Sequence, residues 1–249
     1  MVKAFIFDVD GTLADTERDG HRVAFNQAFE QSGLDWHWDE QTYGELLAVT
    51  GGKERMLHYV QTHDKVERHR PDLQQLIRDL HARKTENYVA LLEHNAIPLR
   101  PGVKRLLEEA REQSIRLAIA TTTTPQNVTA LLKNALGADS LDWFEVIGAG
   151  DIVPAKKPAA DIYHYVLQEM QLAPGECLAF EDSANGIRAS SGADLKTLIT
   201  YNGYTKDDDF SGALLVLDQL GDPGQPSRVL QQTRQQDYLT LELLEGLLA

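Results

Sequence analysis

The stretch that decides the fold is Lys3-Ala4-Phe5-Ile6-Phe7-Asp8-Val9-Asp10-Gly11-Thr12-Leu13-Ala14-Asp15-Thr16. It begins as an apolar run and ends in two carboxylates, Asp8 and Asp10, that are one residue apart. A continuous apolar run predicts a strand that is buried on both faces, as at the centre of a parallel sheet. Open α/β sheets bind their ligands at the carboxyl ends of such strands. We therefore expect Asp8 and Asp10 to belong to a binding site.

The short distance between these carboxylates also predicts a cation. Two carboxylates this close repel each other and undergo large pKa shifts unless something offsets their charge. Mg²⁺ is the cation we expect, because it favours a few carboxylate oxygens together with water and phosphate. A plain acidic turn is the alternative reading, since Asp-Gly is itself a common turn signal.

The pattern Asp-x-Asp-Gly-Thr-Leu-x-Asp-Thr at residues 8–16 resembles the first signature of the haloacid dehalogenase superfamily. The resemblance implies that Asp8 is a nucleophile that passes through an aspartyl-phosphate, a role that carboxylates can take. It implies that Asp10 protonates the leaving oxygen and then activates water. It also implies that Mg²⁺ is bound by Asp8 and by the main-chain carbonyl of Asp10.

The rest of the chain predicts the architecture. After Pro98, strand-like runs at 115–120, 144–147, 177–180 and 195–199 are separated by helical stripes. This alternation predicts an α/β fold, a doubly wound Rossmann-like parallel sheet. From Glu17 to about Asn95 the apolar spacing is helical. We therefore predict a core of residues 1–15 and 97–249, with an inserted all-helical cap at 16–96. The resemblance implies that this cap determines substrate specificity.

Three further motifs of the same superfamily follow predicted strands of the core. Thr121 follows the run at 115–120, and the resemblance implies that its hydroxyl holds the transferring phosphate with help from the Thr122 amide. Lys157, which precedes Pro158, is implied to neutralise the nucleophile and the phosphate. The resemblance implies that Asp182 is a direct Mg²⁺ ligand. It implies that Glu181 is either a ligand itself or a residue that contacts a ligand. Taken alone, the threonine run and the Asp182 region could also be helix caps.

Within this superfamily, the segments 15–22, 43–47 and 50–56 look like those of the CbbY-type sugar-bisphosphate phosphatases of Calvin-cycle operons. Those proteins hydrolyse xylulose-1,5-bisphosphate, a compound that inhibits Rubisco. The resemblance therefore implies a sugar bisphosphate as substrate. It also implies a link to Rubisco that is functional and not necessarily physical.

The cap also contains residues that we expect to bind substrate. They are Glu17, His21, Thr50, Gly51, Gly52, Lys53 and Arg55. The two glycines permit close approach of the backbone, and the two cations supply charge for a second, non-reacting phosphate. An ordinary loop that enters a charged helix is the alternative interpretation of residues 50–56. We expect Arg83 and Lys84 to lie on a solvated face.

Composition excludes some classes of function. The net charge of −14, from 24 Lys and Arg against 38 Asp and Glu, argues against general nucleic-acid binding. It also means that an anionic substrate needs a locally basic pocket. The single cysteine, Cys177, lies in an apolar run and predicts a buried thiol in a reducing, cytoplasmic location. The absence of a long apolar stretch or signal peptide predicts no membrane partner.

Two other functions remain open on the sequence alone. A mutase of the β-phosphoglucomutase type would return the phosphoryl group to the sugar. A phospho-accepting receiver module, which is not an enzyme, also uses aspartates, a threonine and a lysine on a doubly wound sheet, but it has no cap. Dehalogenation is not expected, because that branch does not use the second aspartate or a metal.

Overall fold

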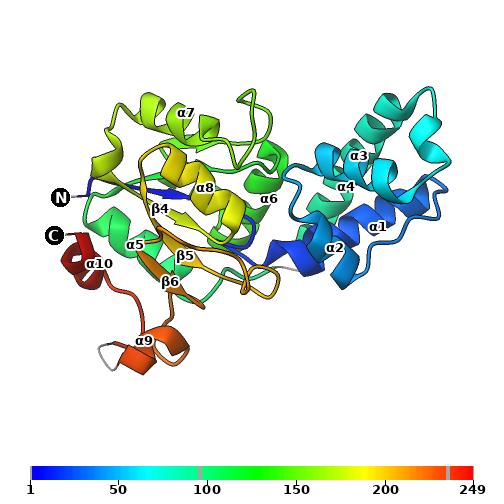
Figure 1. Cartoon of the computed structure of the whole chain (residues 1–249). Helices are drawn as coiled ribbons and strands as arrows, with labels where there is room; N and C mark the ends of the chain where they lie inside the picture. Colours follow the sequence, from blue (N-terminus) through cyan, green and yellow to red (C-terminus); the bar gives the residue numbers. More distant parts are fainter. Residues whose placement is uncertain (1, 95–96, 234–235, 249) are drawn as a thin grey trace.

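The structure is a computed structural model that describes residues 2–94, 97–233 and 236–248. A parallel six-stranded sheet forms the core, and a group of helices extends from one end of it (Figure 1). The strand order is β3-β2-β1-β4-β5-β6, which is the doubly wound order with β1 at the centre. The strands are β1 (Ala4–Phe7), β2 (Arg116–Ala120), β3 (Val146–Gly148), β4 (Cys177–Glu181), β5 (Lys196–Thr200) and β6 (Leu215–Leu217).

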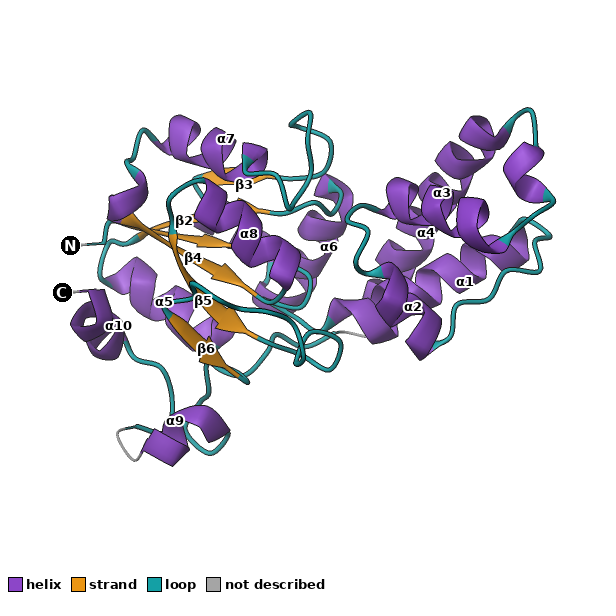
Figure 2. Cartoon of the chain, viewed as in Figure 1, coloured by secondary structure: helices purple, strands orange, loops and turns teal. Residues whose placement is uncertain are grey.

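Helices cover both faces of this sheet (Figure 2). Because side chains of a strand alternate between faces, Phe5 and Phe7 join one apolar cluster, whereas Ala4 and Ile6 join another. The first cluster includes α5 (Val103–Glu112), α6 (Pro125–Leu136) and α10 (Leu241–Leu248). The second includes α7 (Asp161–Met170) and α8 (Ala184–Gly192). This arrangement confirms the predicted α/β fold class.

The helical group follows β1 in the sequence and has an apolar cluster of its own. It begins with a π-helical turn, Glu17–His21, and continues with α1 (Arg22–Gln31), α2 (Glu40–Leu46), α3 (Gly52–His63) and α4 (Leu73–His94). Phe25, Phe29, Trp36 and Trp38 pack among these helices. Residues 95 and 96, where the predicted cap ends, lie outside the described residues, so the predicted boundary at 96/97 stays a prediction.

Two adjacent segments connect the helical group to the core. Ala14, on the way out, forms an antiparallel bridge with Leu99, on the way back. The Arg100 amide donates to the Leu13 carbonyl at 2.8 Å. Helix α4 also packs against α6, where the Asn134 amide donates to the Leu92 carbonyl at 2.8 Å.

Some predicted details differ from the structure. The run at 144–147 becomes a strand only from Val146, because a 3-10 helix occupies Ala138–Trp143. The prediction omitted strand β6, although residues 213–217 form an apolar run. Further short elements are α9 (Arg228–Thr233) and the 3-10 helices Glu67–His69 and Pro174–Glu176. Cys177 is buried, as expected. None of the helices in the described ranges combines the length and apolar composition that crossing a bilayer requires.

Candidate active site

The core residues singled out from the sequence meet at one edge of the sheet. Asp8 follows β1, Thr121 follows β2, and Glu181 and Asp182 stand at the end of β4, the strand next to β1. The carboxyl ends of parallel neighbours lie at the same edge, so these side chains converge. Lys157 joins them from the segment between β3 and α7.

Lys157 is the centre of the hydrogen-bond network at this edge. Its ammonium donates to Asp8 Oδ1 at 2.7 Å, to Glu181 Oε1 at 2.5 Å and to the Ala120 carbonyl at 2.8 Å. Tyr163 on α7 donates its hydroxyl to the same Glu181 oxygen at 2.5 Å. A buried cation is tolerated where its charge and all its donors are satisfied. Lys157 thus fixes the positions of Asp8 and Glu181 relative to each other.

The carboxylates nevertheless outnumber the positive charges here. Burial and the charge of Glu181 raise the pKa of Asp8 to about 8, although Lys157 acts in the opposite direction. Burial, followed by the charges of Asp8 and Glu181, raises the pKa of Asp182 well above its ordinary value. Oxygen atoms of these three buried carboxylates all lie within 4.8 Å of one another. This donor set has the chemistry and the spacing that suit a hard divalent cation.

Two glycines allow the carboxylates to approach the backbone closely. Gly11 has a φ of +86°, and a Cβ there would lie 2.1 Å from Asp182 Oδ2. A Cβ at Gly186 would lie 2.0 Å from Glu181 Oε2. Asn202, in the loop after β5, donates its amide to Asp182 Oδ2 at 2.7 Å. Side chains at these glycines would displace the carboxylates, so their small size is a requirement of the site.

The side chain of Asp10 faces a different set of partners. Its Oδ1 accepts a hydrogen bond from the Thr16 hydroxyl at 2.5 Å and lies 2.8 Å from His21 Nε2. Lys84 Nζ lies 2.7 Å from His21 Nδ1. Because an ammonium group only donates, His21 accepts at Nδ1 and carries its proton at Nε2. Burial raises the pKa of Asp10, but its contacts with His21 and Thr16 outweigh burial and lower it overall.

The expectation that Lys84 lies on a solvated face is wrong. Its side chain is buried, with only 5% of the residue exposed. Lys84 lies over the rings of Phe25 and Tyr88, at 4.9 and 5.3 Å from their centroids. Arg83, its neighbour on α4, is exposed as expected. Lys84 therefore belongs to the interior surface between the helical group and the core.

Glu17 and Arg55 form the wall of the site opposite the sheet. Tyr43 on α2 donates its hydroxyl to Glu17 and accepts a hydrogen bond from Arg55 at 2.8 Å. Arg55 Nη1 is 3.9 Å from Glu17 Oε2, and Arg55 is buried. Thr50 accepts a hydrogen bond at 3.0 Å from Asn185 on α8, so it connects this wall to the core.

Lys53 lines a different part of the surface from Arg55. Its ammonium is 2.5 Å from Asp151 of the core, and Lys156 is 2.9 Å from both Asp151 and Glu54. These four side chains connect α3 to the segment after β3. Lys53 lines a surface groove with Gly52 and His81, whereas Arg55 lines the cavity that contains Asp8. Gly51, with a φ of +96°, precedes α3.

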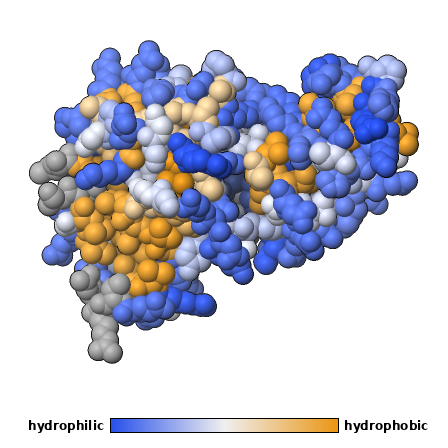
Figure 3. Space-filling view, viewed as in Figure 1, coloured by the Kyte–Doolittle hydropathy of each residue, from blue (hydrophilic) through white to orange (hydrophobic). Residues whose placement is uncertain are grey.

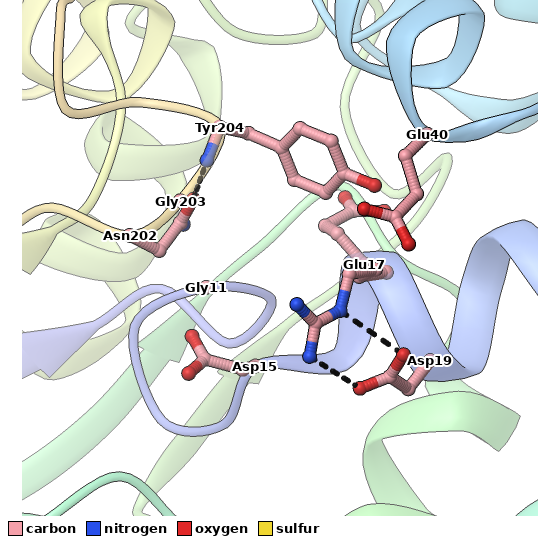
Figure 4. Close-up of a pocket in the computed structure, with 9 residues that line it drawn as sticks. Gly11, Asp15, Glu17, Asp19, Glu40, Asn202, Gly203 and Tyr204 are labelled. Atoms are coloured by element: carbon pink, nitrogen blue, oxygen red, sulfur yellow. Dashed lines mark hydrogen bonds and ion pairs between the residues drawn. The ribbon is translucent and has the colours of Figure 1, made fainter.

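Two of the cavities between the sheet edge and the helical group adjoin each other. One, of about 90 Å³, is lined by Asp8, Asp10, Thr121 and Thr122 from the core and by Thr50 and Arg55 from the helical group. The other, of about 280 Å³, contains Asp15, Asp19 and Glu40 (Figure 4). Glu17, Asn202 and Tyr204 line both cavities. The molecular surface is hollowed between the core and the helical group (Figure 3). The same view shows an apolar area on the core, near α10 and β6.

Sequence reasoning missed four residues of the site: Tyr43, Lys84, Tyr163 and Asn202. Tyr163 and Lys84 occupy apolar faces of helices, so their spacing indicates burial but not a polar partner. Asn202 follows an apolar strand in the same way as Asp8 and Thr121, and this position could have identified it. Tyr43 lies in a segment quoted for the resemblance, yet its link to Glu17 depends on the fold of the helical group.

Comparisons with known proteins identify the family of the chain. The model of the haloacid dehalogenase-like hydrolase family matches residues 2–194. Protein CbbY of Cupriavidus necator is 49% identical over 225 residues, which cover 90% of this chain and 88% of that protein. Protein CbbY of Cereibacter sphaeroides is 45% identical over 90% of this chain and 95% of its own length.

Solved structures give the same result. CbbY from Rhodobacter sphaeroides in complex with xylulose-1,5-bisphosphate superposes with a TM-score of 0.82 at 43% identity, over 88% of this chain and 95% of that one. β-Phosphoglucomutase from Clostridium difficile, at 22% identity and a TM-score of 0.75, covers 97% of its length and all of this chain and shares the fold. The chain therefore belongs to the haloacid dehalogenase-like hydrolases, in the group of the CbbY proteins.

Proposed function

We propose that this enzyme is a Mg²⁺-dependent phosphatase that hydrolyses xylulose-1,5-bisphosphate to xylulose 5-phosphate and phosphate. The observation that carries the proposal is the convergence of Asp8, Thr121, Lys157 and Asp182 at one sheet edge, opposite a wall that contains Arg55. The 43% identical CbbY whose structure contains xylulose-1,5-bisphosphate supports the choice of substrate. Removal of a Rubisco inhibitor would make the link to Rubisco a functional one.

We assign the chemistry to the two aspartates after β1. A carboxylate oxygen of Asp8 forms a bond to phosphorus while the bond from phosphorus to the sugar oxygen breaks, and Asp10, which must enter this step protonated, gives that oxygen its proton. Water then forms a bond to phosphorus, Asp10 takes a proton from it, and the bond between Asp8 and phosphorus breaks to release phosphate. Thr121 holds a phosphoryl oxygen in both steps. Lys157, whose three protons are bonded to Asp8, Glu181 and the Ala120 carbonyl, offsets the negative charge of the phosphoryl group. The network of Thr16, His21 and Lys84 keeps Asp10 directed at the reacting oxygen.

Mg²⁺ would be held by Asp8, Asp182 and the main-chain carbonyl of Asp10. Glu181 would be a further ligand or would contact one of these ligands. The buried carboxylate cluster fits such an ion, since its oxygens lie within 4.8 Å of one another. When bound, Mg²⁺ supplies positive charge that stabilises the phosphoryl group during transfer.

The helical group, residues 16–96, acts as the cap that selects the substrate. Arg55 borders the cavity and is placed to bind the distal phosphate. Lys53 assists if it exchanges its Asp151 partner for that phosphate. Glu17, which lines both cavities, contacts the sugar hydroxyls, with Thr50, Gly51, Gly52 and Thr122 shaping the space around them. The predicted contact of His21 with the sugar is replaced by a supporting role, because Asp10 and Lys84 occupy both of its ring nitrogens. Binding energy from the remote phosphate can then orient the reacting one and close the cap.

The test measures phosphate release with Mg²⁺ from xylulose-1,5-bisphosphate, ribulose-1,5-bisphosphate and a pentose monophosphate. We expect strong preference for xylulose-1,5-bisphosphate, because a site built around one hydroxyl arrangement rejects the epimer. Lys53→Ala and Arg55→Lys should lower kcat/KM on the bisphosphate far more than on the monophosphate. Lys65→Ala, an exposed change on the cap, is the control.

Three results would contradict parts of the proposal. Equal hydrolysis of both bisphosphates would refute the substrate but leave a phosphatase. Equal losses on bisphosphate and monophosphate would refute the distal-phosphate roles of Lys53 and Arg55. Transfer of the phosphoryl group to a second position of the sugar without free phosphate would indicate a mutase.

A further inference from the structure

Arg100 is a buried cation that the chemistry above does not use. It lies where the chain returns from the helical group to the core, directly before α5. Only 8% of the residue is exposed. The nearest carboxylate, Asp15, is 3.6 Å from Nε, and its side chain is 66% exposed. Backbone carbonyls therefore provide most of the contacts of this guanidinium.

Four carbonyls from three segments surround it. Nη1 donates to the carbonyl of Gly11 and, at 2.7 Å, to that of Thr200. Nη2 donates at 2.6 Å to the carbonyls of both Tyr201 and Asp218. The planar guanidinium presents five donors in a fixed arrangement, which a lysine cannot reproduce. Arg100 thus fixes the turn after β1, the end of β5 and the end of β6 relative to one another.

Two of these segments contact Asp182. Gly11 lies so close that a Cβ there would be 2.1 Å from Asp182 Oδ2. Tyr201 precedes Asn202, whose amide donates to that same oxygen at 2.7 Å. Two further hydrogen bonds hold the loop around Asn202: its side-chain oxygen accepts from the Tyr204 backbone amide at 2.8 Å, and its backbone amide donates to the Thr205 hydroxyl at 3.0 Å. A shift of either segment would change the position of Asp182.

We propose that Arg100 is a positioning residue that sets the affinity of the site for Mg²⁺, by holding the Gly11 turn and the Asn202 loop against Asp182. The inference rests on the proposed Mg²⁺ site but does not depend on the identity of the substrate. It makes the segment that returns from the cap part of the support of the metal site.

Arg100→Lys tests the proposal, and Arg105→Lys is its matched control. Arg105 on α5 also bridges several groups: its guanidinium bonds to Asp222 at 3.2 Å, the Gly221 carbonyl at 2.8 Å and Glu109 at 2.9 Å. These contacts reach neither the Gly11 turn nor the Asn202 loop. Both substitutions remove guanidinium contacts at the same end of the core, so both should lower the melting temperature.

The deciding measurement is the Kd for Mg²⁺ by titration calorimetry, without substrate, at a temperature where circular dichroism shows each variant folded. Residues that orient metal ligands typically change metal affinity by about 10- to 100-fold when replaced. We expect such a rise in Kd for Arg100→Lys and a change below about twofold for Arg105→Lys. Asn202→Ala should reproduce the rise, since it removes the hydrogen bond to Asp182.

The possible outcomes separate the proposal from simple stabilisation. An unchanged Kd in folded Arg100→Lys, or equal losses in the Arg100 and Arg105 variants, would overturn it. If Arg100→Lys does not fold, the test uses the Kd for Mg²⁺ of Asn202→Ala. An unchanged Kd in that variant would also overturn the proposal. A wild-type protein that binds no Mg²⁺ would overturn the metal site of the proposed function and this inference with it. Failure to hydrolyse xylulose-1,5-bisphosphate would leave the binding result intact.

Discussion

The two aspartates that follow β1 are one residue apart, yet their side chains have different surroundings. Asp8 lies among core residues, Lys157, Glu181 and Asp182, which come from strand ends and the loop between them. Asp10 is held by Thr16 and His21, which come from the segment that leads into the helical group, and by Lys84 behind His21. Burial and neighbouring carboxylates raise the pKa of Asp8, whereas His21 and Thr16 overcome burial and lower that of Asp10.

The difference separates two kinds of chemistry. The core side collects excess negative charge, which suits a cation and a phosphoryl group. The cap side supplies hydrogen-bond donors that orient a single ionised carboxylate, which suits the second step, in which Asp10 takes a proton from water. Because the second set comes partly from α4, Asp10 is fully held only when the helical group lies against the core. Each prediction below alters one side and measures whether the other is preserved.

The largest effect is expected for Asp8→Asn. A carboxamide is a poor nucleophile, so phosphate release should fall at least about 1000-fold, or about 4 kcal/mol of barrier. The fold should persist, because Lys157 keeps its contacts with Glu181 and the Ala120 carbonyl. Phosphate release and circular dichroism check this. Activity within about tenfold of wild type would exclude Asp8 as the nucleophile.

Asp10→Asn should also be nearly inactive, but with a different metal phenotype from Asp182→Asn. The substitution removes the proton carrier and keeps the main-chain carbonyl, so Mg²⁺ affinity should fall less than in Asp182→Asn. Calorimetric titration of Mg²⁺ into both variants gives the comparison. If both variants lose Mg²⁺ binding to the same extent, the division between a core side and a cap side is incorrect.

Lys84→Met is expected to have an intermediate effect. Without the ammonium, the proton of His21 is no longer confined to Nε2, and the hydrogen bond to Asp10 is lost part of the time. We expect kcat to fall about tenfold, or about 1.4 kcal/mol, with the Kd for Mg²⁺ unchanged. Arg83→Met, on the adjacent exposed position of α4, serves as the control. Weaker Mg²⁺ binding in Lys84→Met would show that the two sides are coupled.

The division between the core side and the cap side also explains which residues of the site could be predicted from the sequence. Asp8, Thr121, Glu181 and Asp182 each follow an apolar strand, and parallel topology brings such positions together without further information. The fold class followed from the same alternation of strands and helices. Strand β6, Leu215–Leu217, was not predicted although it lies in the apolar run at 213–217, whereas β3, which has the same length, was predicted.

The cap side was harder to predict because its contacts join distant positions. His21 and Lys84 are 63 residues apart. The spacing of Lys84 from Leu80 and Tyr88 indicates a buried position, but it does not identify His21 as the partner. The direction of Lys53, toward Asp151, depends on how α3 meets the core. Arg100 gave no signal either, because its partners are carbonyls, which every residue has.

The smallest effect concerns the pH dependence of stabilisation by Mg²⁺. The pKa of Asp8 is raised to about 8 from 3.8, so between these values the metal-free folded protein binds more protons than the unfolded chain. The stabilisation that the protonated Asp8 carboxyl gives to the folded protein is therefore fully present below about pH 4 and is lost as the pH rises toward 8. Mg²⁺ requires the ionised carboxylates, so its affinity increases over the same range.

The melting temperature should consequently rise more on addition of Mg²⁺ at pH 8 than at pH 5.5. At one fixed Mg²⁺ concentration, equal to 100 times the Kd at pH 8, binding stabilises the protein at pH 8 by about 2.7 kcal/mol. This corresponds to several degrees for a chain of this size, at about 2–4 °C per kcal/mol. Asp182→Asn should remove most of this increment, and the exposed Asp207→Asn should not. An increment that is equal at both pH values would mean that Asp8 is already ionised at pH 5.5. The contrast between the two aspartates would then be smaller than the burial of Asp8 indicates.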